Sequence, residues 1–227
     1  MGVIWLVGAT VAGAALYWLV IIGEGAYLGP WAVRMIYRLG APHYDAVRAA
    51  VAAEDSALLL PSLRAALAGA EHPHILDVAT GTGRVPLLLA QAAGFDGEIV
   101  GIDLTPQMLD RARQKHAQAC PQARIRWQSG EAGHLGWPDA SFDMVCCLES
   151  LEYFPRPRRA LAEMARVLRP GGTLVISKWP DGWARALPGR AFSRSALTRH
   201  LAELGLAEIA IRPWQPGNYE LVTARKG

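Results

Sequence analysis

The sequence predicts an α/β domain with a mostly parallel sheet, preceded by one long apolar segment. From residue 74 onward, short apolar runs alternate with helical stretches of about ten residues, which is the pattern of right-handed β–α–β units. A chain of 227 residues with 52% apolar content has enough material for one domain with a full core. From Met1 to Gly23 there is no charged residue, which sets this segment apart from the domain.

Composition disfavours a nucleic-acid partner and a metal site. The formal net charge is only +3, and the arginines between residues 156 and 169 have no interleaved aromatic residues, so we expect no nucleic-acid binding. The three cysteines are odd in number, and Cys146 and Cys147 are adjacent in an apolar run, as expected of reduced core residues. The six histidines are dispersed without metal-ligand spacing.

Residues 1–23 are predicted to form a transmembrane helix. Roughly 20 apolar residues at about 1.5 Å per residue span the ~30 Å hydrocarbon layer. An uncleaved anchor is favoured over a signal peptide, because a basic start and an A-x-A cleavage site are lacking. Arg34, Arg38 and Arg48 follow the span and no Lys or Arg precedes it, so the positive-inside rule predicts a single-pass protein whose following domain is cytoplasmic.

Residues 24–56 are expected to connect this span to the domain at 57–227. Apolar residues at helical spacing between 31 and 39 predict an amphipathic helix, which either lies at the membrane interface or packs on the domain. The span itself carries small residues at the spacing that would seat a transmembrane helix partner. These pairs are Gly8 with Ala12 and Ala9 with Gly13.

The elements of the domain are expected in a regular order. Residues 42–56 are predicted to be connecting and helical, and residues 58–69 a short helix. The predicted strands are 75–79, 98–102, 124–128, 142–147, 173–178, 207–212 and 219–224. The predicted helices are 84–93, 106–117, 157–168 and 193–204. Thr105 is the expected N-cap of the second helix, ahead of Pro106. A Pro-Gly-Asn turn at 216–218 predicts that the last two strands form an antiparallel hairpin.

A glycine turn followed by an acid marks a nucleotide-type cofactor site. Gly81 and Gly83 follow the first strand, where the absence of a Cβ permits a tight turn and close approach of a ligand. Asp103 ends the next strand, where a carboxylate can accept hydrogen bonds from both ribose hydroxyls. A nicotinamide dinucleotide is disfavoured, because its motif needs a third glycine where Pro86 stands.

Four sequence blocks resemble those of class I S-adenosylmethionine-dependent methyltransferases. They are residues 76–83, 101–109, 129–132 with 137–143, and 166–174. The resemblance covers roughly residues 44–225 and is greatest to the methyltransferase type 11 and ubiquinone/menaquinone C-methyltransferase-like branch, in which Tyr44-Asp45 also has a counterpart. It implies a Rossmann-like seven-stranded, mostly parallel sheet with a C-terminal antiparallel hairpin.

The same resemblance implies S-adenosylmethionine as the cofactor. The turn at 77–83 would hold the methionine part, Asp103 the ribose, and Leu104 with Glu131 would border the adenine. Leu148 would lie beneath the sulfonium. The full set of predicted cofactor-binding residues is Asp77, Ala79, Gly81, Gly83, Asp103, Leu104, Met108, Glu131, Ala132 and Leu148.

The resemblance and the span together predict methyl transfer to a hydrophobic, membrane-associated small molecule, such as a quinone precursor, an isoprenoid or a lipid. Methyl transfer depends mainly on positioning, and a base helps where the acceptor must lose a proton. The candidate catalytic residues are Glu149, Glu152 and Tyr153, with His134 behind them. Glu152 would alternatively pair with Arg156.

Two further alternatives remain open from the sequence. The loop at 179–192, with Trp179, Trp183 and Leu187 among two arginines, is either an apolar lid over the substrate or an ordinary surface loop. The whole chain is alternatively a non-catalytic methyltransferase-like subunit of a larger membrane assembly.

Overall fold

The computed structural model describes residues 1–49, 55–215 and 217–227, and its centre is a seven-stranded sheet. The strand order is β3-β2-β1-β4-β5-β7-β6. The strands from β3 to β5 pair in parallel, and β7 pairs antiparallel with both β5 and β6. The strands are β1 His74–Val78, β2 Glu98–Asp103, β3 Arg124–Ser129, β4 Phe142–Cys147, β5 Leu168–Lys178, β6 Leu206–Gln215 and β7 Tyr219–Lys226. The predicted fold class is therefore confirmed, including the C-terminal antiparallel hairpin. Its predicted turn residue Pro216 lies outside the described residues.

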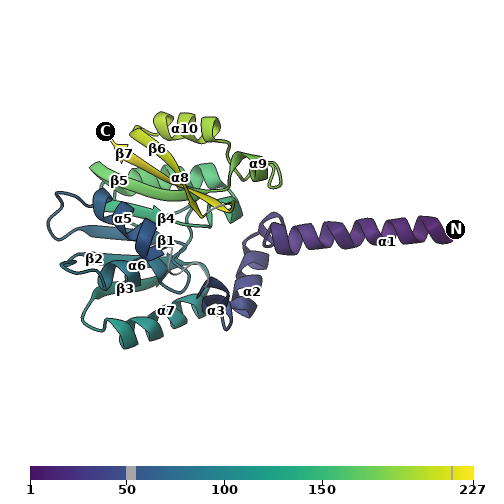
Figure 1. Ribbon diagram of the computed structural model, residues 1–227, viewed down its shortest axis with the longest axis horizontal. Helices are drawn as coiled ribbons and strands as arrows, with labels where there is room; N and C mark the ends of the chain where they lie inside the picture. Colours follow the sequence, from purple (N-terminus) through teal and green to yellow (C-terminus); the bar gives the residue numbers. More distant parts are fainter. Residues whose placement is uncertain (50–54, 216) are drawn as a thin grey trace.

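Helices cover both faces of this sheet (Figure 1). They are α5 Leu60–Ala66, α6 Arg84–Ala90, α7 Pro106–Ala119, α8 Pro157–Val167 and α10 Arg194–Glu203, and a π-helical turn, η4 Asp55–Leu59, precedes α5. The short helix α9 Asp181–Ala184 lies in the loop after β5. Neighbouring residues of a strand point to opposite faces. Leu76 and Val145 accordingly pack in the layer with α8 and α10, while Ile75 and Met144 pack with α5 and α6.

The predicted start of α7 is confirmed. Thr105 occupies the N-cap position with extended backbone, and Pro106 follows in the first turn of the helix. The Thr105 side chain makes no capping hydrogen bond, and the Met108 N–H donates instead to the Thr105 carbonyl at 3.0 Å. Because proline has no N–H, its place in the first turn leaves one donor fewer to satisfy there.

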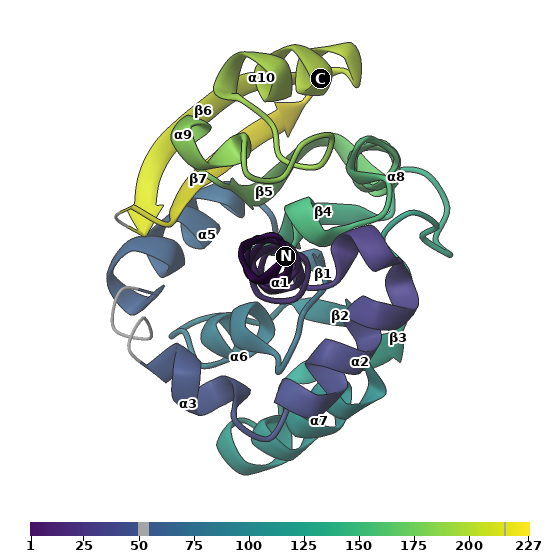
Figure 2. The ribbon, with the colours of Figure 1, turned by 90° about the vertical axis from the view of Figure 1, so that its right-hand side faces the viewer.

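One helix among the described residues is long and apolar enough to cross a membrane. It comprises α1, Gly2–Tyr17, and a continuing π-helical turn, η1 Trp18–Ile22. None of the 18 residues from Trp5 to Ile22 is buried. Figure 1 shows α1 projecting away from the domain, and Figure 2, which looks along α1, shows it over the middle of the domain. The helix α1 therefore lies at the end of the sheet where the parallel strands have their carboxyl ends.

The base of this helix is tied to the loop at 179–192. The Trp18 indole N–H donates to the Ala186 carbonyl at 2.9 Å, and the Tyr27 hydroxyl donates to the Pro188 carbonyl at 2.8 Å. Arg190 donates to the Ala26 carbonyl at 2.7 Å, and Leu187 is fully buried in a small apolar cluster with Ala26. The loop therefore holds the apolar helix on the domain.

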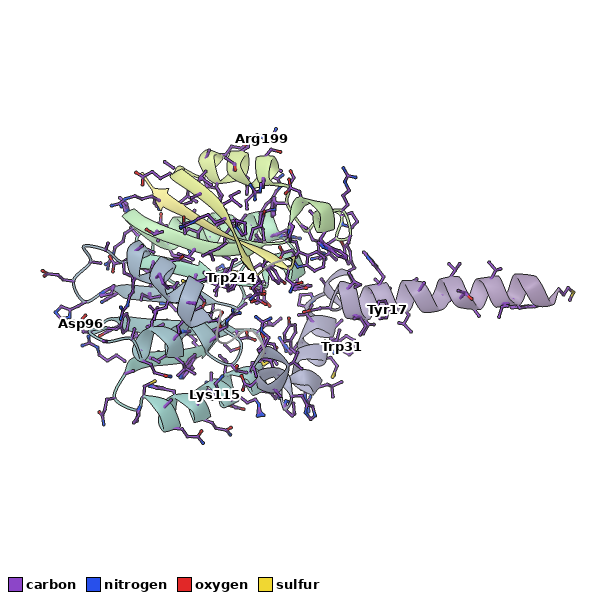
Figure 3. The ribbon with its side chains drawn as sticks, in the orientation of Figure 1. Tyr17, Trp31, Asp96, Lys115, Arg199 and Trp214 are labelled. Carbon is purple, nitrogen blue, oxygen red and sulfur yellow. The ribbon has the colours of Figure 1, made fainter. Side chains whose placement is uncertain are left out.

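Two helices after the anchor form a lid over the domain, which we define as residues 30–48. They are α2 Pro30–Gly40 and α3 Tyr44–Arg48. The Arg111 guanidinium of α7 donates to the carbonyls of Ala41 and Pro42, both at 2.7 Å, so the lid packs on the domain. Its outer side leaves Trp31 71% and Leu39 70% exposed, and Figure 3 shows Trp31 beside the base of α1. Residues 50–54 of the predicted connecting stretch lie outside the described residues.

We expect Gly83→Ala to destabilise the protein more than Gly94→Ala. Both glycines have positive φ, at 86° and 77°, so both variants carry a left-handed alanine, which costs about 1–2 kcal/mol. A Cβ at Gly83 would lie 2.6 Å from the Trp127 ring, whereas a Cβ at Gly94 would meet no heavy atom within 4 Å. Overpacking adds about 1–3 kcal/mol to the first variant. Urea unfolding in detergent without cofactor measures the difference, and equal losses would contradict the prediction.

Candidate active site

A cavity of about 400 Å³ lies where the order of the strands reverses, at the carboxyl ends of β1, β2 and β4. Ligands of open α/β sheets bind in such a crevice. The predicted residues that line it are Ala79, Gly81, Asp103, Leu104, Glu131, Ala132, Leu148, Glu149 and Tyr153, and His134 lines it too. The predicted residues Asp77, Gly83, Met108 and Glu152 are not among its lining residues.

Asp77 shapes the glycine turn from behind. Its carboxylate is 3% exposed and accepts a hydrogen bond from the Thr80 hydroxyl at 2.6 Å. Burial raises the pKa of Asp77 to about 7, and nearby Asp103 adds to the effect while Thr80 opposes it. The turn itself has positive φ at Ala79 (57°) and Gly81 (55°), which exposes its backbone to the cavity.

Asp103 joins the glycine turn to the start of α7. One carboxylate oxygen accepts from the Gly81 N–H at 2.9 Å, and the other accepts from the Thr105 N–H at 2.8 Å. Burial raises the pKa of Asp103, and these backbone donors counteract the rise. Because a carboxylate oxygen has two lone pairs, each oxygen retains one acceptor site for a ligand in the cavity.

These features fit S-adenosylmethionine. The volume lies within the roughly 300–1,000 Å³ typical of small-molecule sites. Asp103 offers the acceptors that a ribose diol needs, and Leu104, Ala132 and Leu148 give apolar walls for a purine and a sulfonium methyl group. The backbone of Gly81 is open, since the nearest atom to a Cβ there would be the Tyr44 hydroxyl of the lid, at 3.8 Å.

The lid is bonded directly to the glycine turn. Asp45, next to Tyr44, accepts from the Thr82 hydroxyl at 2.6 Å and from the Lys115 ammonium at 2.8 Å. Burial alone would raise the pKa of Asp45, but Lys115 and Thr82 lower it. Burial also raises the pKa of Tyr44 to about 12, so its hydroxyl stays protonated over the cavity. The sequence singled out Tyr44-Asp45 by resemblance but gave it no contact.

Glu149 forms the most connected polar cluster of the site. It has a positive φ of 54° and its carboxylate pairs with Arg48 of the lid and Arg84 of α6. The Gln215 amide also donates to this carboxylate, at 2.7 Å. Burial raises the pKa of Glu149, but the two arginines outweigh burial and lower it. Because its pKa is lowered, the Glu149 carboxylate is a weak base. Its ion pairs connect the lid to α6.

Glu152 and Tyr153 lie differently from each other. Glu152 is 1% exposed, and one oxygen accepts from the Trp179 N–H at 2.8 Å, so it contacts this backbone rather than Arg156. Its other oxygen has no hydrogen-bond partner among the described residues, and burial raises the pKa to about 7. Tyr153 lines the cavity, and burial together with Glu24 raises the pKa of its hydroxyl.

Sequence reasoning missed Glu24 and Tyr37. The Tyr37 hydroxyl of α2 donates to the Glu24 carboxylate, which comes directly after the helix base. Burial raises the pKa of Glu24, and the Tyr37 and Tyr153 hydroxyls oppose the rise. Glu24 could have been noticed in the sequence as the first charged residue after the uncharged segment. No sequence pattern, however, indicates that residue 24 lies close to residue 153.

The fold, the glycine turn and the acid at the end of β2 define the class I S-adenosylmethionine-dependent methyltransferases. Residues 76–176, less than half of the chain, match the family described as "Methyltransferase domain". The match ends at Ile176 in β5, before the antiparallel hairpin, and begins after the anchor and lid.

The relatives of this chain are methyltransferases with different acceptors. It is similar to a demethylmenaquinone methyltransferase of Deinococcus radiodurans, with 49% identity over 106 residues, or 47% of this chain and 43% of that protein. It is also similar to an O-methyltransferase of Penicillium expansum, with 40% identity over 112 residues, or 49% of this chain and 40% of that protein. The chain thus spans less than half the length of these relatives.

The fold is shared with magnesium protoporphyrin IX methyltransferase of Synechocystis PCC 6803, solved with bound SAH. The TM-score is 0.62 at 18% identity, covering 78% of this chain and 84% of that one. At this identity the likeness concerns the fold alone.

The pKa of Asp77 predicts a pH dependence of stability. The folded-state pKa of about 7 lies above the ordinary aspartate value of 3.8, so the folded protein retains a proton that the unfolded chain releases between these pH values. Stability therefore falls as pH rises through this window, by up to about 4 kcal/mol. Asp77→Asn should reduce the fall between about pH 5 and about pH 8, measured by urea unfolding at each pH.

Glu163→Gln is the matched control. Hydrogen bonds from Arg166 lower the pKa of Glu163 to about 2, so its contribution changes only under more acidic conditions. This variant should lose stability equally at both pH values. An unchanged pH dependence in Asp77→Asn would show that Asp77 does not hold the extra proton.

Proposed function

We propose that this protein transfers a methyl group from S-adenosylmethionine to a hydrophobic, membrane-associated small molecule. The observation that carries the proposal is the position of the apolar helix relative to the methyltransferase cavity. The helix base and the cavity belong to the same end of the sheet, and the lid between them borders both (Figure 2). An acceptor dissolved in the bilayer would therefore meet the enzyme beside its cofactor.

The surface around the helix base supports a membrane-facing orientation. Exposed apolar and aromatic residues surround it, as is typical of the membrane interface. They include Leu28 (56%), Trp31 (71%), Leu39 (70%) and Trp183 (56%). Exposed arginines at 34, 38 and 185 accompany them, which suits an anionic cytoplasmic leaflet. We infer a single-pass topology with the domain, residues 57–227, in the cytoplasm and residues 24–56 at the interface.

Cofactor binding is divided among the residues of the cavity. Asp103 would accept the ribose hydroxyls, and the open backbone of the turn at 79–83, held by Asp77, would receive the methionine part. Leu104, Glu131 and Ala132 would border the adenine, and Leu148 the sulfonium. Met108 lies outside this cavity and would support the start of α7. When bound, the cofactor supplies an electrophilic methyl group.

The candidate catalytic residues would act in three ways. Glu149 would hold the lid closed through Arg48, and Glu152 would fix the strand end at Trp179. Tyr153 would orient the acceptor as a hydrogen-bond donor, because its hydroxyl stays protonated. The acceptor's proton would pass to Glu24, whose hydrogen-bond partner is a neutral phenol rather than an arginine and whose pKa is raised by burial.

We expect Asp103→Ala to abolish most of the affinity for S-adenosylmethionine. The variant loses two hydrogen bonds that the ligand's hydroxyls would donate to a charged acceptor, worth about 1.5–3 kcal/mol each, so the dissociation constant should rise at least about 100-fold. Isothermal titration calorimetry of the detergent-solubilised chain measures it.

Asp143→Ala is the control for this titration. Asp143 lies at the opposite end of β4 and pairs with Arg169 at 2.9 Å, so the variant loses a carboxylate without touching the cavity. Its affinity should equal that of the unaltered protein. If the unaltered chain binds no cofactor, the result favours the alternative of a non-catalytic subunit. In that case a partner helix would pack on the small residues of α1. Incubating membranes with methyl-labelled cofactor and extracting the lipids then identifies the acceptor class.

Glu24→Gln should lower kcat by about 10²–10⁴-fold while leaving cofactor affinity unchanged, since it removes the proton acceptor. Tyr37→Phe keeps the carboxylate but removes a hydrogen bond that lowers the pKa of Glu24. The pH at which kcat falls on acidification should therefore move upward in Tyr37→Phe. Full activity of Glu24→Gln would exclude this residue as the base.

A further inference from the structure

A second cavity, of about 810 Å³, opens beside the base of the anchor helix. It lies between the helix base, the lid, the start of α9 and the turn between β6 and β7. Residues from all four line it, among them Val20, Ile21, Ile36, Val47, Trp183 and Asn218. We call it the membrane-side groove.

The membrane-side groove meets the cofactor cavity. Tyr37, Tyr44 and Glu149 line both spaces, so these residues form the boundary between them. The two spaces extend to different elements: the cofactor cavity reaches Arg156 and Arg159 near α8, whereas the groove reaches Val20 at the helix base. A molecule in the groove would therefore approach the cofactor from the side of the helix base.

The outer end of the groove is apolar and exposed at the level of the helix base. Ile21 is 55%, Val47 75% and Trp183 56% exposed, and all three line the groove. Such a concentration of exposed large apolar side chains on a domain surface marks a contact with lipid or another apolar partner. Because Ile21 belongs to the apolar helix itself, the groove continues directly into the zone that the bilayer would occupy.

The inner end of the groove is polar. Glu24 and Tyr37 are hydrogen bonded to each other there, and the buried Gln215 adds an amide group. A space with an apolar outer end and a hydrogen-bonding inner end suits an amphipathic molecule with a hydrocarbon chain and a hydroxyl-bearing head.

We propose that the membrane-side groove is the acceptor site, which takes the hydrocarbon chain of a hydroxylated ring compound laterally from the bilayer and places its ring between Glu24, Tyr37 and Glu149. This inference rests on the proposed function, because it assigns the acceptor of that same reaction. It explains why the anchor helix is fixed on the domain by the loop at 179–192: the outer wall of the groove is made of both.

Photolabelling tests the groove without depending on turnover. The full chain in vesicles of phosphatidylcholine and phosphatidylglycerol is irradiated with a long-chain alkylphenol that carries a diazirine in its chain, and labelled residues are located by mass spectrometry. Label at Val20, Ile21, Val47 or Trp183, displaced by excess unlabelled alkylphenol, is expected. Label confined to the exposed residues of α1 farther from the domain, such as Leu6 and Val11, would overturn the proposal.

A blocking variant and a matched control sharpen the test. Val47→Trp fills the groove from α3, and Leu39→Trp makes the same kind of change on α2 at a residue that lines neither cavity. Val47→Trp should lower groove labelling about tenfold or more, since it displaces several methylenes of the chain, while Leu39→Trp should not. Equal labelling in both would overturn the proposal. Ile21→Trp serves if Val47→Trp fails to fold.

Methyl-transfer assays with added cofactor distinguish a failure of the groove proposal from a failure of the proposed methyltransferase function. With S-adenosylmethionine added, Val47→Trp should lose methyl transfer to the long-chain phenol yet retain cofactor affinity and transfer to a phenol without the chain. If the unaltered protein binds no cofactor but shows displaceable label in the groove that Val47→Trp removes, the lipid site stands and the methyltransferase activity falls. If the unaltered protein and Val47→Trp both methylate phenols with and without the chain equally, the groove proposal is contradicted and the methyltransferase function stands.

Discussion

The carboxylate of Glu149 holds together the parts from which the site is made. It follows β4 and pairs with Arg48 of the lid and Arg84 of α6, and it accepts from Gln215 at the end of β6. A buried ion cluster gives little net stability, because desolvation offsets attraction, but removing one partner leaves a charge unpaired at a cost of about 3–5 kcal/mol. The cluster therefore fixes the lid specifically, at the boundary between the two cavities.

This arrangement links the apolar helix to the cavity through a short path. The loop at 179–192 binds the helix base, Trp179 begins that loop, and its N–H donates to Glu152 beside the cavity. The lid follows the helix base in sequence and carries Tyr37 and Tyr44 to the cavity. Positioning dominates methyl transfer, so under the proposed function these contacts would set where an acceptor stands relative to the cofactor.

The sheet was predictable because its signals are local. The alternation of apolar runs with helices gave the strands within a few residues, and Gly81, Gly83 and Asp103 are close in sequence to the turn that they shape. The contacts of the lid and of Glu24 were not predictable in the same way. Asp45 with Lys115, Arg48 with Glu149 and Glu24 with Tyr153 join residues 70 to 129 positions apart, and no periodicity records such pairs.

By itself the sequence determined the fold class, the methyltransferase motifs and one apolar helix, since each depends on short-range pattern: strand alternation, a glycine turn, an uncharged run. Tertiary structure alone decided that Asp77 lies behind the turn rather than on the cavity, that Glu149 is neutralised by two arginines, and that Glu24 stands beside Tyr37. These outcomes depend on burial and on which distant charges meet, and both arise only when the chain packs.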